Sequence, residues 1–165
     1  MLSQLAGFNS EDCLIHGIGN VGRQDDGLGW AFIDWLERED LCPRARKMRH
    51  YQLFLEDADL LGRVDRVLFV DASKEADLES FRLDPVAARY DLSFTSHALT
   101  IPAVMAICQQ CFERVPEVQL LQVRGYSWDL SEGLTAKAQA NLNAATAAFA
   151  AGQGAAGEQA GTDAA

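Results

Sequence analysis

The chain has 165 residues, a formal net charge of −10 and a sequence pI of about 4.6. This length is enough for one domain with a buried core, and 48% hydrophobic and 23% charged residues are ordinary for a globular protein. The acidic balance and the lack of a dense basic cluster argue against nucleic-acid binding. No apolar run approaches the roughly 18 residues of a membrane span, and no signal peptide is recognisable, so we expect a cytoplasmic protein without a membrane partner.

Strand-like and helix-like hydrophobic patterns alternate along the chain, which is typical of an α/β fold. Strands are predicted, in chain order, over residues 12–18, 46–54, 66–71, 79–83 and 118–123. Helices are predicted over residues 27–39, 101–114 and 135–150, with a short helix or turn at 57–63. The alternation predicts a three-layer sandwich in which helices flank a mostly parallel or mixed central sheet of about five strands.

The composition changes near residue 150. Residues 1–150 are expected to form a single α/β domain, because no linker or repeat interrupts them. Residues 151–165 are mostly Ala, Gly and Gln, without an aromatic residue or an apolar period. Such a segment buries too little surface to offset its ordering entropy, so we expect a disordered, dispensable tail.

Four cysteines are present, and two of them form a C-x-x-C motif, Cys108 to Cys111. This motif is compatible with redox chemistry or zinc binding. It also lies on the apolar stripe of the helix predicted over 101–114, which favours core packing for both thiols. No second C-x-x-C or nearby histidine pair completes a zinc site, so packing is the preferred interpretation.

The first predicted strand leads into a glycine-rich loop, and a strongly amphipathic helix follows. Gly17, Gly19 and Gly22 form a G-x-G-x-x-G pattern, which occurs in dinucleotide-binding proteins. Between this loop and the helix, however, lie Asp25 and Asp26, which would repel a pyrophosphate at the helix start. The loop is therefore better suited to a cation than to an anion.

A dinucleotide site also needs an acidic residue about twenty positions further on, at the end of the second strand. Residues 42–52 contain no acid. Arg44, Arg46 and Arg49 could instead serve the 2′-phosphate of NADP, so an NADP-binding module that uses the three loop glycines is kept as the least favoured alternative.

Open α/β sheets bind ligands beyond the carboxyl ends of their strands. Asp25 and Asp26 follow the first strand, Asp71 ends the third, and His97 precedes the helix predicted at 101–114. Carboxylates with an imidazole suit a borderline divalent cation such as zinc, nickel or iron(II). Each residue also has a structural interpretation: Asp26 can stabilise the helix N-terminus, and a lone histidine is more often structural than a ligand.

Within the aspartate pair, Asp25 is expected to be solvated or to brace the loop. The remaining histidines, His16 and His50, are assigned no site role, and Asp57 is interpreted as a loop or helix-start acid.

Four segments, in order and at plausible spacing, resemble the hydrogenase maturation proteases. Residues 17–29 contain Gly-Ile-Gly-Asn and Asp-Asp-Gly-Leu-Gly, similar to the opening motif of that family, and residues 68–72 resemble its strand ending in Asp-Ala. Residues 96–99, Ser-His-Ala-Leu, resemble its histidine motif, and residues 125–135 resemble the segment before its last helix. The resemblance covers about residues 12–148.

The resemblance implies an endopeptidase, of the aspartyl type, that trims the C-terminus of the large-subunit precursor of a NiFe hydrogenase after nickel insertion. It assigns Asp26, where some members carry Glu, together with Asp71 and His97, to the catalytic and metal-recognising site. It also implies that nickel belongs to the substrate and that no organic cofactor is needed. The partner is then the precursor, and the enzyme is expected to be a monomer.

Two routes of attack on the peptide bond remain open: a carbonyl or water activated by the metal, and base catalysis by a carboxylate. The main alternative to a protease is an assembly factor that uses the same three residues to hold a metallated partner without cutting it.

Overall fold

The computed structural model describes residues 5–90 and 99–162. These residues form a five-stranded sheet in the order β2-β1-β3-β5-β4. The strands are β1 (Cys13–Ile18), β2 (Arg46–His50), β3 (Arg66–Ser73), β4 (Phe81–Val86) and β5 (Glu117–Arg124). The first three and β5 run parallel, whereas β4 pairs antiparallel with β5 at the edge. The sheet is thus mixed and mostly parallel.

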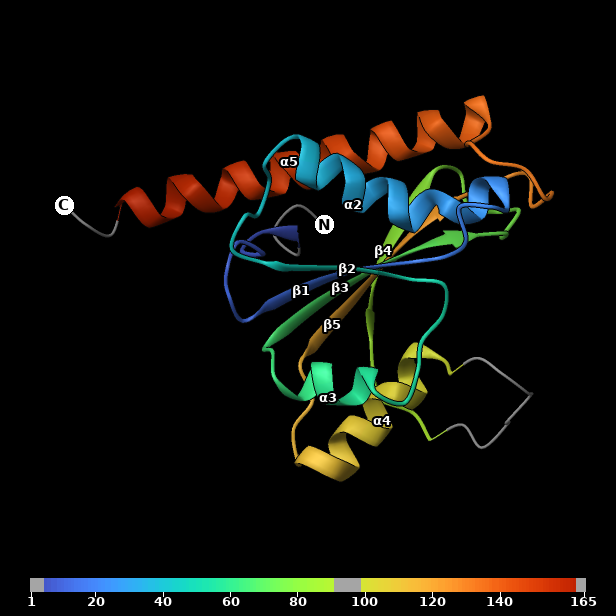
Figure 1. Cartoon of the computed structure of the whole chain (residues 1–165). Coiled ribbons are helices and arrows are strands. Elements are labelled where there is room, and N and C mark those ends of the chain that lie inside the picture. The colour runs from blue at the N-terminus through green and yellow to red at the C-terminus, as the bar shows by residue number, and fades with distance from the viewer. Residues whose placement is uncertain (1–4, 91–98, 163–165) are drawn as a thin grey trace.

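Helices cover both faces of this sheet, as Figure 1 shows. On one side lie α2 (Leu28–Arg38), which follows the 3₁₀ turn η1 (Gln24–Gly27), and α5 (Ala136–Thr162). On the other lie α3 (Asp57–Gly62) and α4 (Ile101–Phe112). Each side has its own apolar core, and residues 67–70 of β3 are completely buried between them. The predicted three-layer α/β sandwich is confirmed. No helix of the described residues is long and apolar enough to span a membrane.

The C-terminal helix continues beyond the predicted end at residue 150. Where the composition of residues 151–165 predicted disorder, α5 continues through Thr162. Its first extra turn packs on the domain: Gly152 is buried, and the Gln153 side-chain amide donates a hydrogen bond to the carbonyl oxygen of Leu5. A contact with the N-terminal segment, which the composition of the tail does not reveal, therefore holds the helix at Gln153.

We expect two truncations of this helix to behave differently. Ending the chain after Gly154 keeps the Gln153 contact and should leave the melting temperature nearly unchanged. Ending it after Ala151 removes one buried residue and one hydrogen bond, about 1 kcal/mol, and should lower Tm by roughly 2–4 °C. Thermal unfolding followed by circular dichroism measures both. Equal Tm values for the two truncations would show that the Gln153 contact contributes nothing.

The C-x-x-C pair of α4 is divided between the core and the surface. The Cys108 side chain is fully buried and lies 3.2 Å from the carbonyl oxygen of Arg114, whereas Cys111 is exposed. The prediction that both thiols pack in the core is therefore correct for Cys108 and wrong for Cys111, because α4 ends soon after Cys111 and its last turn turns that residue outward.

This difference predicts unequal effects of removing the two thiols. Cys108→Ala should cost roughly 1–2 kcal/mol of unfolding free energy, because it leaves a cavity among packed side chains. Cys111→Ala should remain within about 0.5 kcal/mol of the parent, as is usual for surface positions. Urea unfolding of both variants measures the difference. A larger loss for Cys111→Ala would contradict its assignment to the surface.

Candidate functional site

A cleft opens at the carboxyl ends of the parallel strands, on the side of the sheet that α3 and α4 cover. Its volume is about 460 Å³, and its walls come from the loop after β1, the segment after β2, the end of β3 and the start of α4. Most of the lining is apolar, including Ile18, Leu53 and Ile101. Two carboxylates, Asp26 and Asp71, also line it. The structure thus brings together two of the three site residues that the sequence predicted.

The glycine-rich loop positions Asp26 by close backbone packing. Gly19 has a φ of +133°, and a Cβ there would overlap the carbonyl oxygen of Asp26. A Cβ on Gly29 would likewise overlap the carbonyl oxygens of Ile18 and Val70, so the start of α2 lies directly against β1 and β3. These glycines permit close contact of helix and strands, which is a different use from cradling a phosphate.

A backbone N–H of the glycine-rich loop is also hydrogen-bonded to the side chain of Asp26. The N–H of Asn20 donates to Oδ2 of Asp26 over 3.0 Å. In a dinucleotide-binding loop such amides face the pyrophosphate. Here the side chain of Asp26 occupies that N–H, which argues against the NADP-binding alternative.

Asp71 lies at the carboxyl end of β3 in the same cleft, partly buried. Burial raises the pKa of Asp71 to about 6; the hydrogen bond from the Ala72 N–H opposes this rise, and the nearby charge of Asp26 adds to it. Both burial and the second carboxylate make the ionised form unfavourable. A cation bound between the two acids would relieve both effects.

Asp25 has a different role from its neighbour. Its side chain is completely buried and accepts four hydrogen bonds from described residues. The donors are the N–H groups of Tyr126 (2.7 Å), Ser127 (3.1 Å) and Thr135 (2.7 Å) and the hydroxyl of Thr135 (2.8 Å). Burial by itself would raise the pKa of Asp25, but these hydrogen bonds outweigh it and lower the pKa. The predicted bracing role is confirmed, with the acid buried and not solvated.

The third predicted site residue, His97, lies outside the described residues. The described chain resumes at Leu99, which lines the cleft and forms an antiparallel bridge with Leu53. The role of His97 thus stays a prediction.

Several solved structures resemble this chain in fold. The hydrogenase maturating endopeptidase HybD from E. coli matches with a TM-score of 0.63 and 16% identity, over 82% of this chain and 87% of that one. The NiFe hydrogenase maturation protease HycI from Thermococcus kodakarensis matches with a TM-score of 0.65 and 18% identity, over 82% and 87%. The hydrogenase 2 maturation peptidase from Thaumarchaeota archaeon SCGC_AB-539-E09 matches with a TM-score of 0.60 and 20% identity, over 82% and 93%.

No protein-family model and no curated protein sequence matches the chain. The chain therefore has the fold of the hydrogenase maturation proteases at low sequence identity, which confirms the fold that the motif resemblance implied.

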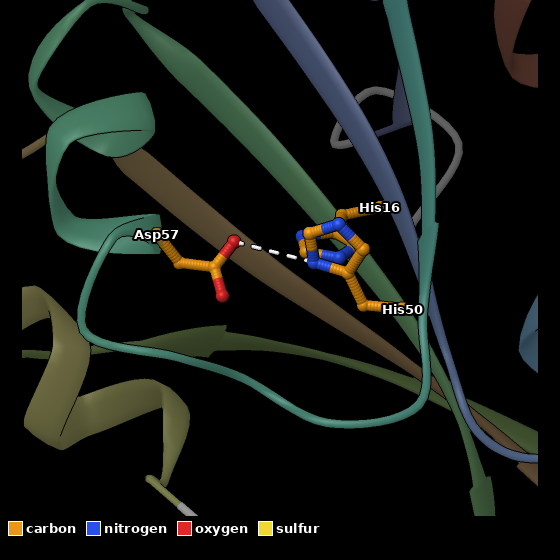
Figure 2. Close-up of side chains that lie close together, drawn as sticks. All are labelled: His16, His50 and Asp57. Carbon is orange, nitrogen blue, oxygen red and sulfur yellow. Dashed lines mark ion pairs between the residues drawn. The ribbon is translucent and has the colours of Figure 1, made fainter.

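The structure also brings together three residues that the sequence left without a role in binding. His16, His50 and Asp57 offer ligand atoms that all lie within 4.8 Å of one another (Figure 2). One sequence signal for this cluster was available: His16 is a polar residue inside an otherwise apolar, buried strand. The proximity of the other two depends on where the segment after β2 turns back, which local patterns do not reveal.

Proposed function

We propose that this protein is an endopeptidase that removes the C-terminal extension of the large-subunit precursor of a NiFe hydrogenase after nickel insertion. It acts in this proposal as a cytoplasmic monomer, and Asp26, Asp71 and His97 recognise the nickel that the precursor carries. The observation that supports the proposal best is the pair of carboxylates, Asp26 and Asp71, in one apolar cleft of a maturation-protease fold.

The electrostatics of the cleft favour a metal that arrives with the substrate. An acid of raised pKa beside a second acid gains from a cation, and oxygen and nitrogen donors suit nickel. A precursor without nickel would bring no charge to offset the two carboxylates. The two carboxylates would then distinguish the nickel-loaded precursor from the nickel-free one.

The surroundings of the cleft suit a protein substrate. Tyr51 lines the cleft, is 59% exposed and stacks on Trp30 with ring centroids 5.1 Å apart. Phe54 and Leu55, which follow on the same segment, are also exposed. Exposed apolar side chains next to a functional cleft commonly mark a surface for protein contact.

Cleavage itself needs a polarised carbonyl and an activated water. The nickel of the substrate could polarise the carbonyl or the water, and a carboxylate of the cleft could accept the proton of that water. Asp71, with a pKa near 6, is ionised at neutral pH and can serve as that base.

Incubation with nickel-loaded and nickel-free precursor tests the proposed function. We expect mass spectrometry to find a shortened large subunit only in the nickel-loaded sample. An uncut precursor that co-purifies with this protein in a nickel-dependent manner would instead support the non-cleaving assembly factor. No cleavage and no complex with either precursor would reject both.

A further inference from the structure

A second group of metal-type donors, which includes neither of the two cleft carboxylates, lies at the meeting point of three elements. His16 lies within β1, His50 is the last residue of β2, and Asp57 is the first residue of α3. Figure 2 shows the two imidazole rings next to each other, with the carboxylate of Asp57 directed towards them. The rings of His16 and His50 are 4.8 Å apart between centroids and nearly perpendicular.

Four polar atoms of these three residues are buried and have no hydrogen-bond partner among the described residues. Neither ring nitrogen of His16, which is 0% exposed, has a hydrogen bond to any described residue, and the same holds for Nδ1 of His50 and Oδ1 of Asp57. The last two atoms are 3.6 Å apart, too far for a hydrogen bond. Leaving such atoms unpaired in the interior costs free energy, and native structures seldom do so without a reason.

The carboxylate of Asp57 is already oriented for a ligand. Its Oδ2 accepts a hydrogen bond of 2.7 Å from the N–H of Phe54, which leaves Oδ1 directed at His50. The backbone of His50 is held as well, because its carbonyl oxygen accepts from the N–H of Gly19 (3.0 Å) and from Nε1 of Trp30 (3.1 Å). In metal sites, hydrogen bonds from neighbouring residues to the ligand residues hold those ligands in position.

We propose that His16, His50 and Asp57 bind a divalent metal ion, with Zn²⁺ the best suited. Two imidazoles and one carboxylate are a frequent ligand set for zinc, and water can take the fourth position. The His50 side chain is 32% exposed, which gives ion and water a path from solvent. The ligand atoms of tetrahedral zinc lie about 3.3 Å apart. The ligand atoms of His16, His50 and Asp57 lie within 4.8 Å of one another, so small side-chain rotations would bring them to that spacing.

The protonation state of His16 is compatible with this site. Burial, and secondarily the charge of His50, lowers the pKa of His16 to about 3. The His16 ring is therefore neutral at physiological pH and has a free lone pair for a metal.

The metal would have a structural role, and it would hold one wall of the cleft in place. It would connect β1, the end of β2 and the start of α3, and the segment between His50 and Asp57 includes Tyr51 and Leu53, which line the cleft. A bound ion would fix this wall without contacting the substrate. The proposed site is independent of the proposed protease function, since it uses none of the three recognition residues.

Cobalt titration of the full-length chain tests the proposal. The parent for this experiment carries Asp26→Asn and Asp71→Asn, so that the cleft does not compete for the metal. We expect one Co²⁺ per chain, with the intense visible absorption of a four-coordinate ion, and displacement by Zn²⁺. Adding His50→Gln or Asp57→Asn should weaken Co²⁺ affinity at least about tenfold, whereas Asp59→Asn, a partly exposed acid on the same helix paired with Arg63, should not.

The variants are chosen to keep the fold. Gln at position 50 leaves the backbone hydrogen bonds of that residue intact, and Asn at position 57 still offers an oxygen to the Phe54 N–H. Circular dichroism checks that each is folded. Absence of stoichiometric Co²⁺ binding by the parent overturns the proposal whatever the variants do. Unchanged affinity in a folded His50→Gln or Asp57→Asn protein overturns it as well.

Discussion

Replacing Asp71 by Asn is expected to abolish cleavage of nickel-loaded precursor in a protein that still folds. Asn keeps the shape of the side chain and an oxygen for the Ala72 N–H, but it removes the charge that would meet the metal. Asp26→Asn should also abolish cleavage, because it removes the second charge. It should still fold, because its amide oxygen can accept from the Asn20 N–H. Losing one electrostatic contact of this kind lowers rates by at least about a hundredfold.

Initial rates of precursor shortening, followed by mass spectrometry, measure this effect. The matched control is Asp59→Asn, which removes a carboxylate from a partly exposed position on α3 and should keep full activity. His97→Ala belongs in the same series as the third predicted recognition residue. Full activity in the Asp71 or His97 variant would remove that residue from the site.

Asp71→Asn should, in addition, be at least as stable as the parent at neutral pH. The folded state raises the pKa of Asp71 to about 6, above its ordinary value. The folded state therefore binds this proton more tightly than the unfolded state does. Between the ordinary pKa and the folded-state pKa, the free energy of unfolding falls as pH rises. At pH 7 the ionised carboxylate destabilises the folded state. Asn avoids that cost. Urea unfolding should therefore favour the variant at pH 7, and the difference should shrink below about pH 4. A clearly less stable variant at pH 7 would contradict this.

Asp25→Asn is expected to have the largest effect on stability among the loop variants, about 2–3 kcal/mol. The carboxylate accepts from three backbone N–H groups and one hydroxyl, and an amide can offer only one oxygen to them. Its NH₂ group would instead face a donor in a buried site. The loop after β1 would then be joined to the segment 126–135 only by the remaining contacts, such as the backbone hydrogen bonds from Gln24 to Ser131 and from Asp25 to Ser127, while the cleft acids would remain in place.

The pH dependence of this loss identifies the charge as its cause. Because the folded state lowers the pKa of Asp25, its contribution is present above the unfolded value, about 3.9, and is lost as pH falls through the folded pKa. Chemical unfolding of parent and variant should therefore differ most near neutral pH and converge in acid. A variant that remains folded should keep cleavage activity. A difference in stability that does not change with pH would assign the effect to packing.

Local sequence patterns were enough to predict the layers and the position of the cleft acids. The apolar run of β3 predicts a central strand buried on both faces, because only such a strand needs no polar side. An acid at its end, Asp71, and an acid after the glycine loop, Asp26, then lie at one edge by the geometry of parallel strands. Each of these inferences uses neighbouring residues only.

The remaining features depend on segments that are distant in sequence. The buried hydrogen bonds of Asp25 join it to Thr135, and the Gln153 side chain joins α5 to Leu5. The burial of one thiol and the exposure of the other depend on where α4 ends on the sheet.

By itself, the sequence determined the α/β class of this protein, the mostly parallel sheet and the edge at which its acids gather, because hydrophobic period and strand ends are local properties. Only the tertiary structure decided that Asp25 is a brace and that His16, His50 and Asp57 lie close together. The reason is physical: burial and hydrogen-bond partners are set by which distant segments pack together, and no window of the sequence contains that information.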